Sequence, residues 1–223
     1  MISPDTACET RYMMAHGTVC VTAGLTGLLS FVFLTVAIAT DYWYVIDVSD
    51  SRYNNGEGWE DLNSHSGLWR ICEGKNACIA LIDPFSEESQ SVPESQQHLL
   101  FMQKVFVILL PLSLVLLVLG GIGGLISSLA NGLYLLLFTG SYFLIGGALT
   151  LAGICVYVAY SKAAFAIAKH IYGDKVFDNV HIGFSWSMVL ACLSCILEVM
   201  SGALFLLAAK LSTVGQPEQS AVI

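Results

Sequence analysis

The sequence predicts an all-α membrane bundle with a small β ectodomain, and three observations carry this prediction. Of the 223 residues, 56% are hydrophobic and only 12% are charged, a composition that ordinary soluble domains do not have. Four apolar stretches each reach the ~20 residues that a helix needs to cross a hydrocarbon core about 30 Å thick. The loop after the first stretch instead contains β-branched and aromatic runs, which favour strands.

The four stretches predict transmembrane helices over residues 17–39, 105–128, 133–160 and 185–209. Ala37-Ile38-Ala39 resembles a signal-peptide cleavage site, but the first stretch exceeds the ~7–15 apolar residues of a signal peptide. We therefore expect a retained helix. The remaining segments are an N-terminal segment 1–16, a first long loop 40–104, a turn 129–132, a second long loop 161–184 and a tail 210–223.

The net charge of −8 is concentrated in the first long loop, where acidic residues far outnumber basic ones. This imbalance disfavours contact with nucleic acid or anionic headgroups, and it suits a solvated or cation-attracting surface. We therefore expect no nucleic-acid partner.

The numbers of Lys and Arg do not establish which side faces the cytoplasm, because Lys162, Lys169 and Lys175 lie in the second long loop. Cys72 and Cys78 decide instead, since paired thiols in a water-exposed loop favour a disulfide, and disulfides persist in oxidising space. We expect a plasma-membrane protein with both long loops outside and both termini in the cytoplasm.

Residues 42–48, 67–72 and 77–82 predict strands, and residues 73–76 have the turn chemistry of a hairpin. The hairpin brings Cys72 and Cys78 close enough for a disulfide. A metal site is the alternative, but two thiols without further ligands seldom hold zinc.

The sequence around the second long loop predicts a helix followed by an edge strand. The helical spacing of the third span continues to Tyr172, and Gly173 offers a C-terminal cap. Residues 176–182 then alternate like a strand that would extend the first-loop sheet. Similarly, Pro93 and Glu94 fit the start of a short helix that leads into the second span.

The arrangement of tryptophans, a Gly-Leu-Trp run and paired cysteines on a four-span chain resembles the claudin superfamily, which includes peripheral myelin protein and the calcium-channel gamma subunits. The resemblance implies a left-handed four-helix bundle capped by an extracellular antiparallel sheet of about five strands. Arg70 and an acidic residue in the fourth span, Glu198, resemble the gamma-subunit branch in particular. The shared motif consists of Trp43, Gly67, Leu68, Trp69, Cys72 and Cys78.

Two interpretations apply to the tryptophans. Trp43 and Trp69 either pack the sheet onto the helix ends, where an amphipathic indole fits well, or contact a partner directly. Arg70 is expected to pair with a loop carboxylate such as Asp41.

Glu198 is an ionisable group in mid-span, which costs about 2.5 kcal/mol or more. It either binds a partner or is a protonated, hydrogen-bonded residue that faces the bundle, toward Ser113, Thr139 or Ser141. Both hypotheses stay open at this point.

No sequence pattern predicts catalysis. Ser185 has His181 nearby, but nothing supplies an orienting group and an oxyanion site. Residues 120–124, Gly-Gly-Ile-Gly-Gly, lie in an apolar helix without the Lys-Ser/Thr of a phosphate loop, so they predict close helix packing. We expect no enzyme activity, no cofactor, no metal and no small-molecule substrate.

The expected partners are the lipid bilayer and other membrane proteins. The leading hypothesis is lateral self-association with copies of this chain or with other claudin-like proteins, together with adhesion at cell junctions. The alternative is an auxiliary subunit that modulates an ion channel or an AMPA-type receptor.

Overall fold

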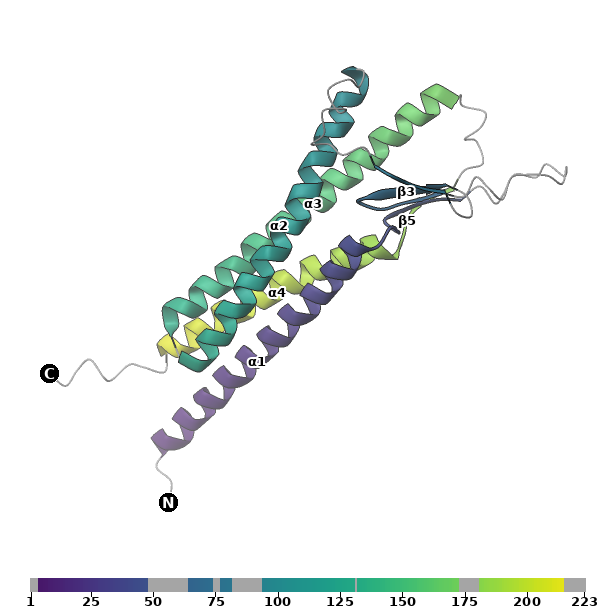
Figure 1. Ribbon diagram of the computed structural model, residues 1–223. Helices are drawn as coiled ribbons and strands as arrows, with labels where there is room; N and C mark the ends of the chain where they lie inside the picture. The colour runs from purple at the N-terminus through teal and green to yellow at the C-terminus, as the bar shows by residue number, and fades with distance from the viewer. Residues whose placement is uncertain are drawn as a thin grey trace. The chain divides into compact units, whose positions relative to one another are not determined.

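The computed structural model describes residues 4–47, 64–73, 77–81, 94–130, 132–172 and 181–214. Within these ranges the chain forms four long helices and five short strands (Figure 1). The helices are α1 (Pro4–Ala39), α2 (Glu94–Ala130), α3 (Leu133–Tyr172) and α4 (Trp186–Val214). The strands are β1 (Tyr44–Asp47), β2 (Ser64–Ser66), β3 (Arg70–Glu73), β4 (Ala77–Ala80) and β5 (His181–Phe184).

Each helix contains an apolar segment long enough to cross a membrane, which confirms the predicted set of four. Large apolar side chains are exposed along all four segments, as expected where hydrocarbon rather than water surrounds a helix that satisfies its own backbone. The segments are Met13–Ala39, Gln97–Ser128, Leu133–Ile167 and Trp186–Thr213.

Two helices continue beyond their apolar spans as the sequence predicts. Helix α2 already begins at Glu94, and α3 ends at Tyr172, next to the expected capping glycine. The turn is shorter than predicted, because α2 ends at Ala130 and α3 begins at Leu133. The side of the membrane on which each segment lies stays a prediction.

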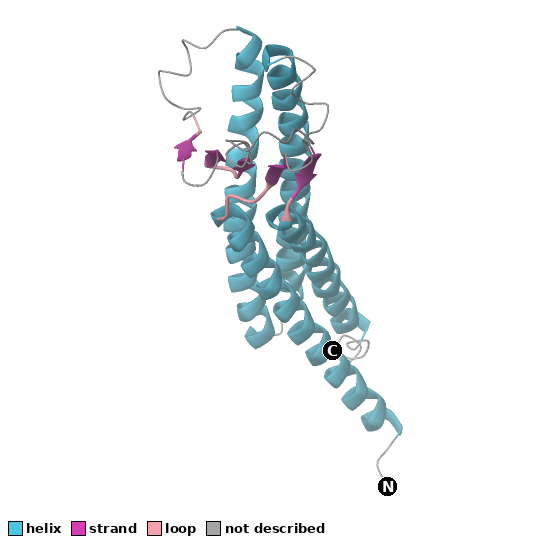
Figure 2. Ribbon diagram, turned by 90° about the vertical axis from the view of Figure 1, so that its right-hand side faces the viewer, coloured by secondary structure: helices cyan, strands magenta, loops and turns pink. Residues whose placement is uncertain are grey.

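The chain divides into two compact units, and every helix contributes a segment to each. We call the first the helical unit; it comprises Met1–Phe33, Leu112–Leu149 and Leu193–Ile223. We call the second the sheet unit; it comprises Leu34–Pro111 and Thr150–Cys192 and contains all five described strands (Figure 2).

Glycines allow close helix contacts in the helical unit. A Cβ on Gly140 would lie 3.1 Å from the carbonyl oxygen of Gly202, and one on Gly202 would lie 3.0 Å from that of Gly140. Helices α3 and α4 therefore meet backbone to backbone. A Cβ on Gly120 would lie 3.1 Å from the ring of Phe143, so the packing role predicted for this glycine is confirmed.

The five strands form one antiparallel sheet in the order β4-β3-β2-β1-β5. Strand β5 pairs with β1 from Tyr44 opposite Phe184 to Asp47 opposite His181. The second long loop thus adds an edge strand to the first-loop sheet, as predicted. Most of the alternating run 176–182 lies outside the described residues.

One expectation about the strands was wrong, and one strand was missed. Strand β3 begins at Arg70, because residues 67–69 form a turn in which the Gly67 N–H donates to the Arg70 carbonyl at 2.9 Å. The short strand β2 was not predicted, because Ser-His-Ser lacks the β-branched and aromatic residues that favour strands.

Candidate functional site

The site begins at the C-terminal end of α1, where the last carbonyl groups of the helix have no partner within it. The indole N–H of Trp43 donates to the carbonyl of Ala37 at 2.7 Å. The indole N–H of Trp69 donates to the next carbonyl, that of Ile38, at 2.9 Å. The two motif tryptophans therefore cap one helix end from different parts of the first loop.

Trp43 also links the helices of the sheet unit to the sheet. Its side chain is fully buried, and its ring packs on Tyr157 of α3 with centroids 4.8 Å apart. Tyr157 in turn contacts the ring of Phe106 on α2 at 5.3 Å, and its hydroxyl donates to the Ser66 carbonyl of β2 at 3.5 Å. One indole thus contributes to the contacts between the first helix, the third helix and the sheet.

The Gly-Leu-Trp turn, residues 67–69, fits against Asp41, just after the end of α1, because its first residue has no side chain. A Cβ on Gly67 would lie 2.5 Å from the Cα of Asp41 and 2.6 Å from its Oδ1, so any side chain there would displace the backbone. Leu68 is fully buried, whereas Trp69 is 42% exposed while it caps the helix.

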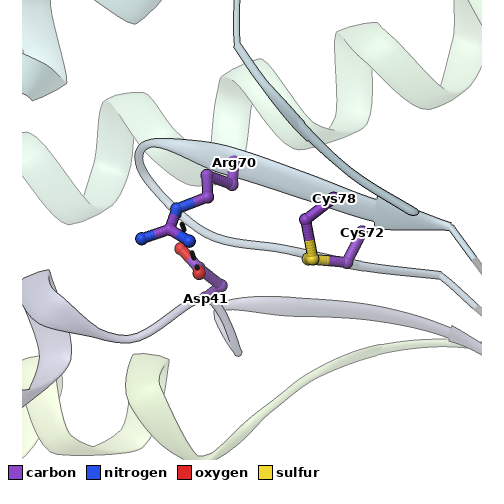
Figure 3. Close-up of a disulfide and its surroundings, with 4 residues drawn as sticks. All are labelled: Asp41, Arg70, Cys72 and Cys78. Atoms are coloured by element: carbon purple, nitrogen blue, oxygen red, sulfur yellow. Dashed lines mark ion pairs between the residues drawn. A yellow bond between two sulfur atoms is a disulfide. The ribbon is translucent and has the colours of Figure 1, made fainter. Parts of the chain in front are cut away.

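A disulfide fixes the other end of strand β3. Cys72 and Cys78 lie opposite each other on β3 and β4, and the predicted disulfide between them is confirmed (Figure 3). At the first residue of β3, the Nε atom of Arg70 lies 3.8 Å from Oδ2 of Asp41. This ion pair was also expected, but its largely exposed guanidinium makes it a weak contributor to stability.

A separate polar cluster occupies the helical unit. Glu198 is fully buried, and its Oε1 accepts a hydrogen bond from the hydroxyl of Ser194 at 3.1 Å, one turn earlier on α4. The hydroxyl of Ser30 on α1 lies 3.5 Å from the same oxygen and 2.8 Å from the Ser194 hydroxyl. Cβ atoms on Gly146 and Gly147 would lie 3.5 and 3.6 Å from Oε2, so the carboxyl group also lies against this part of α3.

The chain matches the model of a known family. The family model described as PMP-22/EMP/MP20/Claudin tight junction matches residues 28–207, which is most of the chain. The chain belongs to this family. All candidate site residues, from Ser30 to Glu198, lie inside the matched region. The four apolar helices, the five-stranded sheet and the disulfide therefore describe a claudin-like tetraspan membrane protein.

In this claudin-like chain two of the three expected partners, Ser141 and Thr139, do not bond to Glu198. Ser141 donates to the Leu137 carbonyl at 2.9 Å, and the Thr139 hydroxyl has no hydrogen-bond partner among the described residues. The Ser113 carbonyl borders Gly146, as Glu198 does. Sequence reasoning missed two serines, although the spacing of Ser194 and Glu198, one helical turn apart, was a usable signal.

Ser30 gave no comparable signal. It lies on α1, and its hydroxyl also donates to the Ser194 carbonyl at 3.1 Å, a contact that depends on how two helices far apart in sequence face each other. The cluster is therefore a contact between the first and the fourth helix.

Proposed function

We propose that this chain is a non-enzymatic protein that acts through protein contacts, by lateral self-association with copies of itself or with other claudin-like proteins at cell junctions of the plasma membrane. The proposal rests on strand β4, which lies at an edge of the sheet and is joined to β3 by the disulfide. Strand β4 has a strand partner on one side only among the described strands, its Ile79 is 64% exposed, and the disulfide holds it on β3.

An open strand edge with an exposed apolar side chain is a template for pairing with another chain. Such an edge is a liability in a monomer, which makes it a suitable contact in an assembly. The family match supports self-association in general terms.

Expression in non-adherent cells tests this proposal. The wild-type chain should become enriched where two expressing cells touch, and freeze-fracture should show linear assemblies. Ile79→Asp should abolish both while surface expression persists. Tyr134→Asn changes a side chain that is 86% exposed on α3 in the helical unit, and it should leave both unchanged. A wild-type chain that stays uniformly distributed on the cell surface would contradict the proposal.

The proposed orientation places both long loops outside and both termini in the cytoplasm. The Cys72–Cys78 disulfide supports it, because disulfides persist in oxidising space. An epitope tag at the C-terminus should be accessible to antibody only after the cells are permeabilised, and accessibility on intact cells would reverse the orientation.

A second candidate function is an auxiliary subunit of an ion channel or an AMPA-type receptor. Arg70 and Glu198 support it through their resemblance to the gamma-subunit branch. Residues 64–74 and 109–114 further resemble the orphan transmembrane proteins 235 and 114. Because Glu198 is buried, such a partner would contact the sheet or the exposed faces of α3 and α4 rather than this carboxyl group.

Co-purification distinguishes the two candidates. An auxiliary subunit should co-purify with a pore-forming subunit and shift its gating on co-expression. A self-associating junction protein should do neither, and it should form its assemblies in cells that lack the channel.

A further inference from the structure

The end of the first membrane span and the beginning of the fourth lie next to each other in the sheet unit. The apolar span of α1 ends at Ala39, and that of α4 begins at Trp186. The Ser187 N–H donates to the Tyr42 carbonyl at 3.3 Å, and the hydroxyls of Thr40 and Ser187 lie 2.9 Å apart. These bonds hold the end of the first span beside the beginning of the fourth.

Aromatic side chains gather at the junction. Tyr42, Phe184 and Trp186 are 42%, 48% and 45% exposed. Tyr42 stacks in parallel on His65 of β2 with centroids 4.4 Å apart, and it lies 5.8 Å from Trp186. Tyr44 meets Phe184 edge to face at 6.1 Å. We call Tyr42, Tyr44, His65, Phe184 and Trp186 the aromatic strip.

Two polar groups of the strip make no hydrogen bond to the described residues. The indole groups of Trp43 and Trp69 donate to α1, whereas that of Trp186 donates no hydrogen bond to any described residue, and neither does the hydroxyl of Tyr42. Tyr44 is partly buried, and burial raises its pKa to about 12.

We propose that the aromatic strip lies in the headgroup layer of the membrane leaflet that adjoins the sheet. The rings of Tyr42 and Trp186 would rest at the boundary of the acyl chains, and their O–H and N–H groups would donate to lipid phosphate or ester carbonyl oxygens. Aromatic side chains with an apolar body and a polar tip accumulate at this depth. A consequence is that β1 and β5, the strands that continue from α1 and into α4, hold the sheet at a fixed depth.

Continuity with the spans identifies lipid as the occupant rather than a protein. Val36 on α1 and Val189 on α4 are 37% and 54% exposed within the apolar spans, as apolar side chains that contact hydrocarbon are. The strip adjoins these spans in sequence, since Tyr42 follows the end of the α1 span and Trp186 begins the α4 span. This inference does not depend on which partner the sheet binds.

Depth-dependent fluorescence quenching tests the proposal on the full-length protein in phosphatidylcholine liposomes. The signal of Trp186 is obtained as the difference between the wild type and Trp186→Phe. Quenching of this signal by a nitroxide on the choline headgroup should be at least about twice as strong as quenching by a nitroxide at carbon 12 of the acyl chain, because interfacial indoles lie at headgroup depth. Aqueous acrylamide should quench it weakly.

Two outcomes would overturn the proposal. Quenching by acrylamide with no effect of either lipid label would show that the strip faces water or a protein site. Stronger quenching by the carbon-12 label would place Trp186 in the hydrocarbon core. Circular dichroism and the intact disulfide would verify that Trp186→Phe is folded.

A second measurement needs no substitution. Phosphatidylcholine with a photoreactive headgroup should label wild-type peptides that contain Tyr42 or Trp186, and absence of label from both peptides would also contradict the proposal.

Discussion

The sheet unit and the helical unit both place polar groups in apolar surroundings, but they satisfy them differently. In the sheet unit the polar groups are backbone carbonyls at the end of α1, and Trp43 and Trp69 reach them with indole N–H groups. In the helical unit the polar group is the side chain of Glu198, and the hydroxyls of Ser194 and Ser30 surround it. The arrangement in the sheet unit requires a side chain of a particular shape. The arrangement in the helical unit requires a group that can accept hydrogen bonds.

This difference has a consequence for substitutions. An indole that must reach a particular carbonyl, or a glycine that must lie against a backbone, has no equivalent replacement. A carboxyl group that accepts hydrogen bonds from hydroxyls can be replaced by an amide. The sheet unit should therefore be the less tolerant of the two.

The largest effect is expected from Trp43. Trp43→Ala should lower the free energy of unfolding by about 3–5 kcal/mol, because it removes a fully buried ring. Trp43→Phe keeps most of the packing but removes the indole hydrogen bond to the Ala37 carbonyl, at about 1 kcal/mol. Denaturant unfolding in detergent micelles measures both. A Trp43→Ala variant as stable as the wild type would show that the indole does not hold the sheet unit together.

Gly67→Ala should cost about 1–3 kcal/mol, because the new Cβ would overlap Asp41 and force the backbone apart. Gly183 is the matched control, since no atom lies within 4 Å of a Cβ built there. Gly183→Ala should change stability by no more than about 0.5 kcal/mol. Equal melting temperatures for the two variants would show that the Gly-Leu-Trp turn does not lie against Asp41.

Loss of the disulfide should have a smaller but measurable effect. The double variant Cys72→Ser, Cys78→Ser should lose about 2 kcal/mol, because the bridge closes only a short loop. Cys155→Ser, which removes an exposed free cysteine, serves as the control. If reduction of the wild type leaves its unfolding curve unchanged, the disulfide does not brace the sheet.

The smallest effects are expected at Glu198. Glu198→Gln keeps an acceptor for Ser194 and should change stability by less than about 0.5 kcal/mol. Glu198→Leu removes every acceptor and should cost about 1 kcal/mol, as interhelical hydrogen bonds in membranes do. The same micelle assay compares them. Similar losses for both variants would show that an ionised carboxylate, rather than its hydrogen bonds, is what the helical unit requires.

Much of the fold could be predicted from local signals in the sequence. Span length and apolar composition gave the four helices, and the turn chemistry of residues 73–76 gave the hairpin and hence the Cys72–Cys78 bridge. The alternation near residue 182 indicated the edge strand β5. In each case the signal lies within a single segment of the chain.

Features that depend on contacts between distant segments could not be predicted. Leu68 and Trp69 have the propensity of strand residues, yet they form a turn because Gly67 lies against Asp41. The contact of Ser30 with Glu198 depends on which face of α1 points toward α4. In a helix that is apolar on all sides, no periodicity shows that face.

The claim that the motif tryptophans cap α1 is tested most directly by hydrogen exchange of the indole N–H groups. Nitrogen-15 NMR of tryptophan-labelled protein in lipid nanodiscs can follow each group, with assignments from single Trp→Phe variants. The indole proton of Trp43 should exchange many times more slowly than that of a free indole, and the proton of the half-exposed Trp69 should exchange at an intermediate rate. Exchange of the Trp43 proton at the free-indole rate would show that Trp43 does not cap α1.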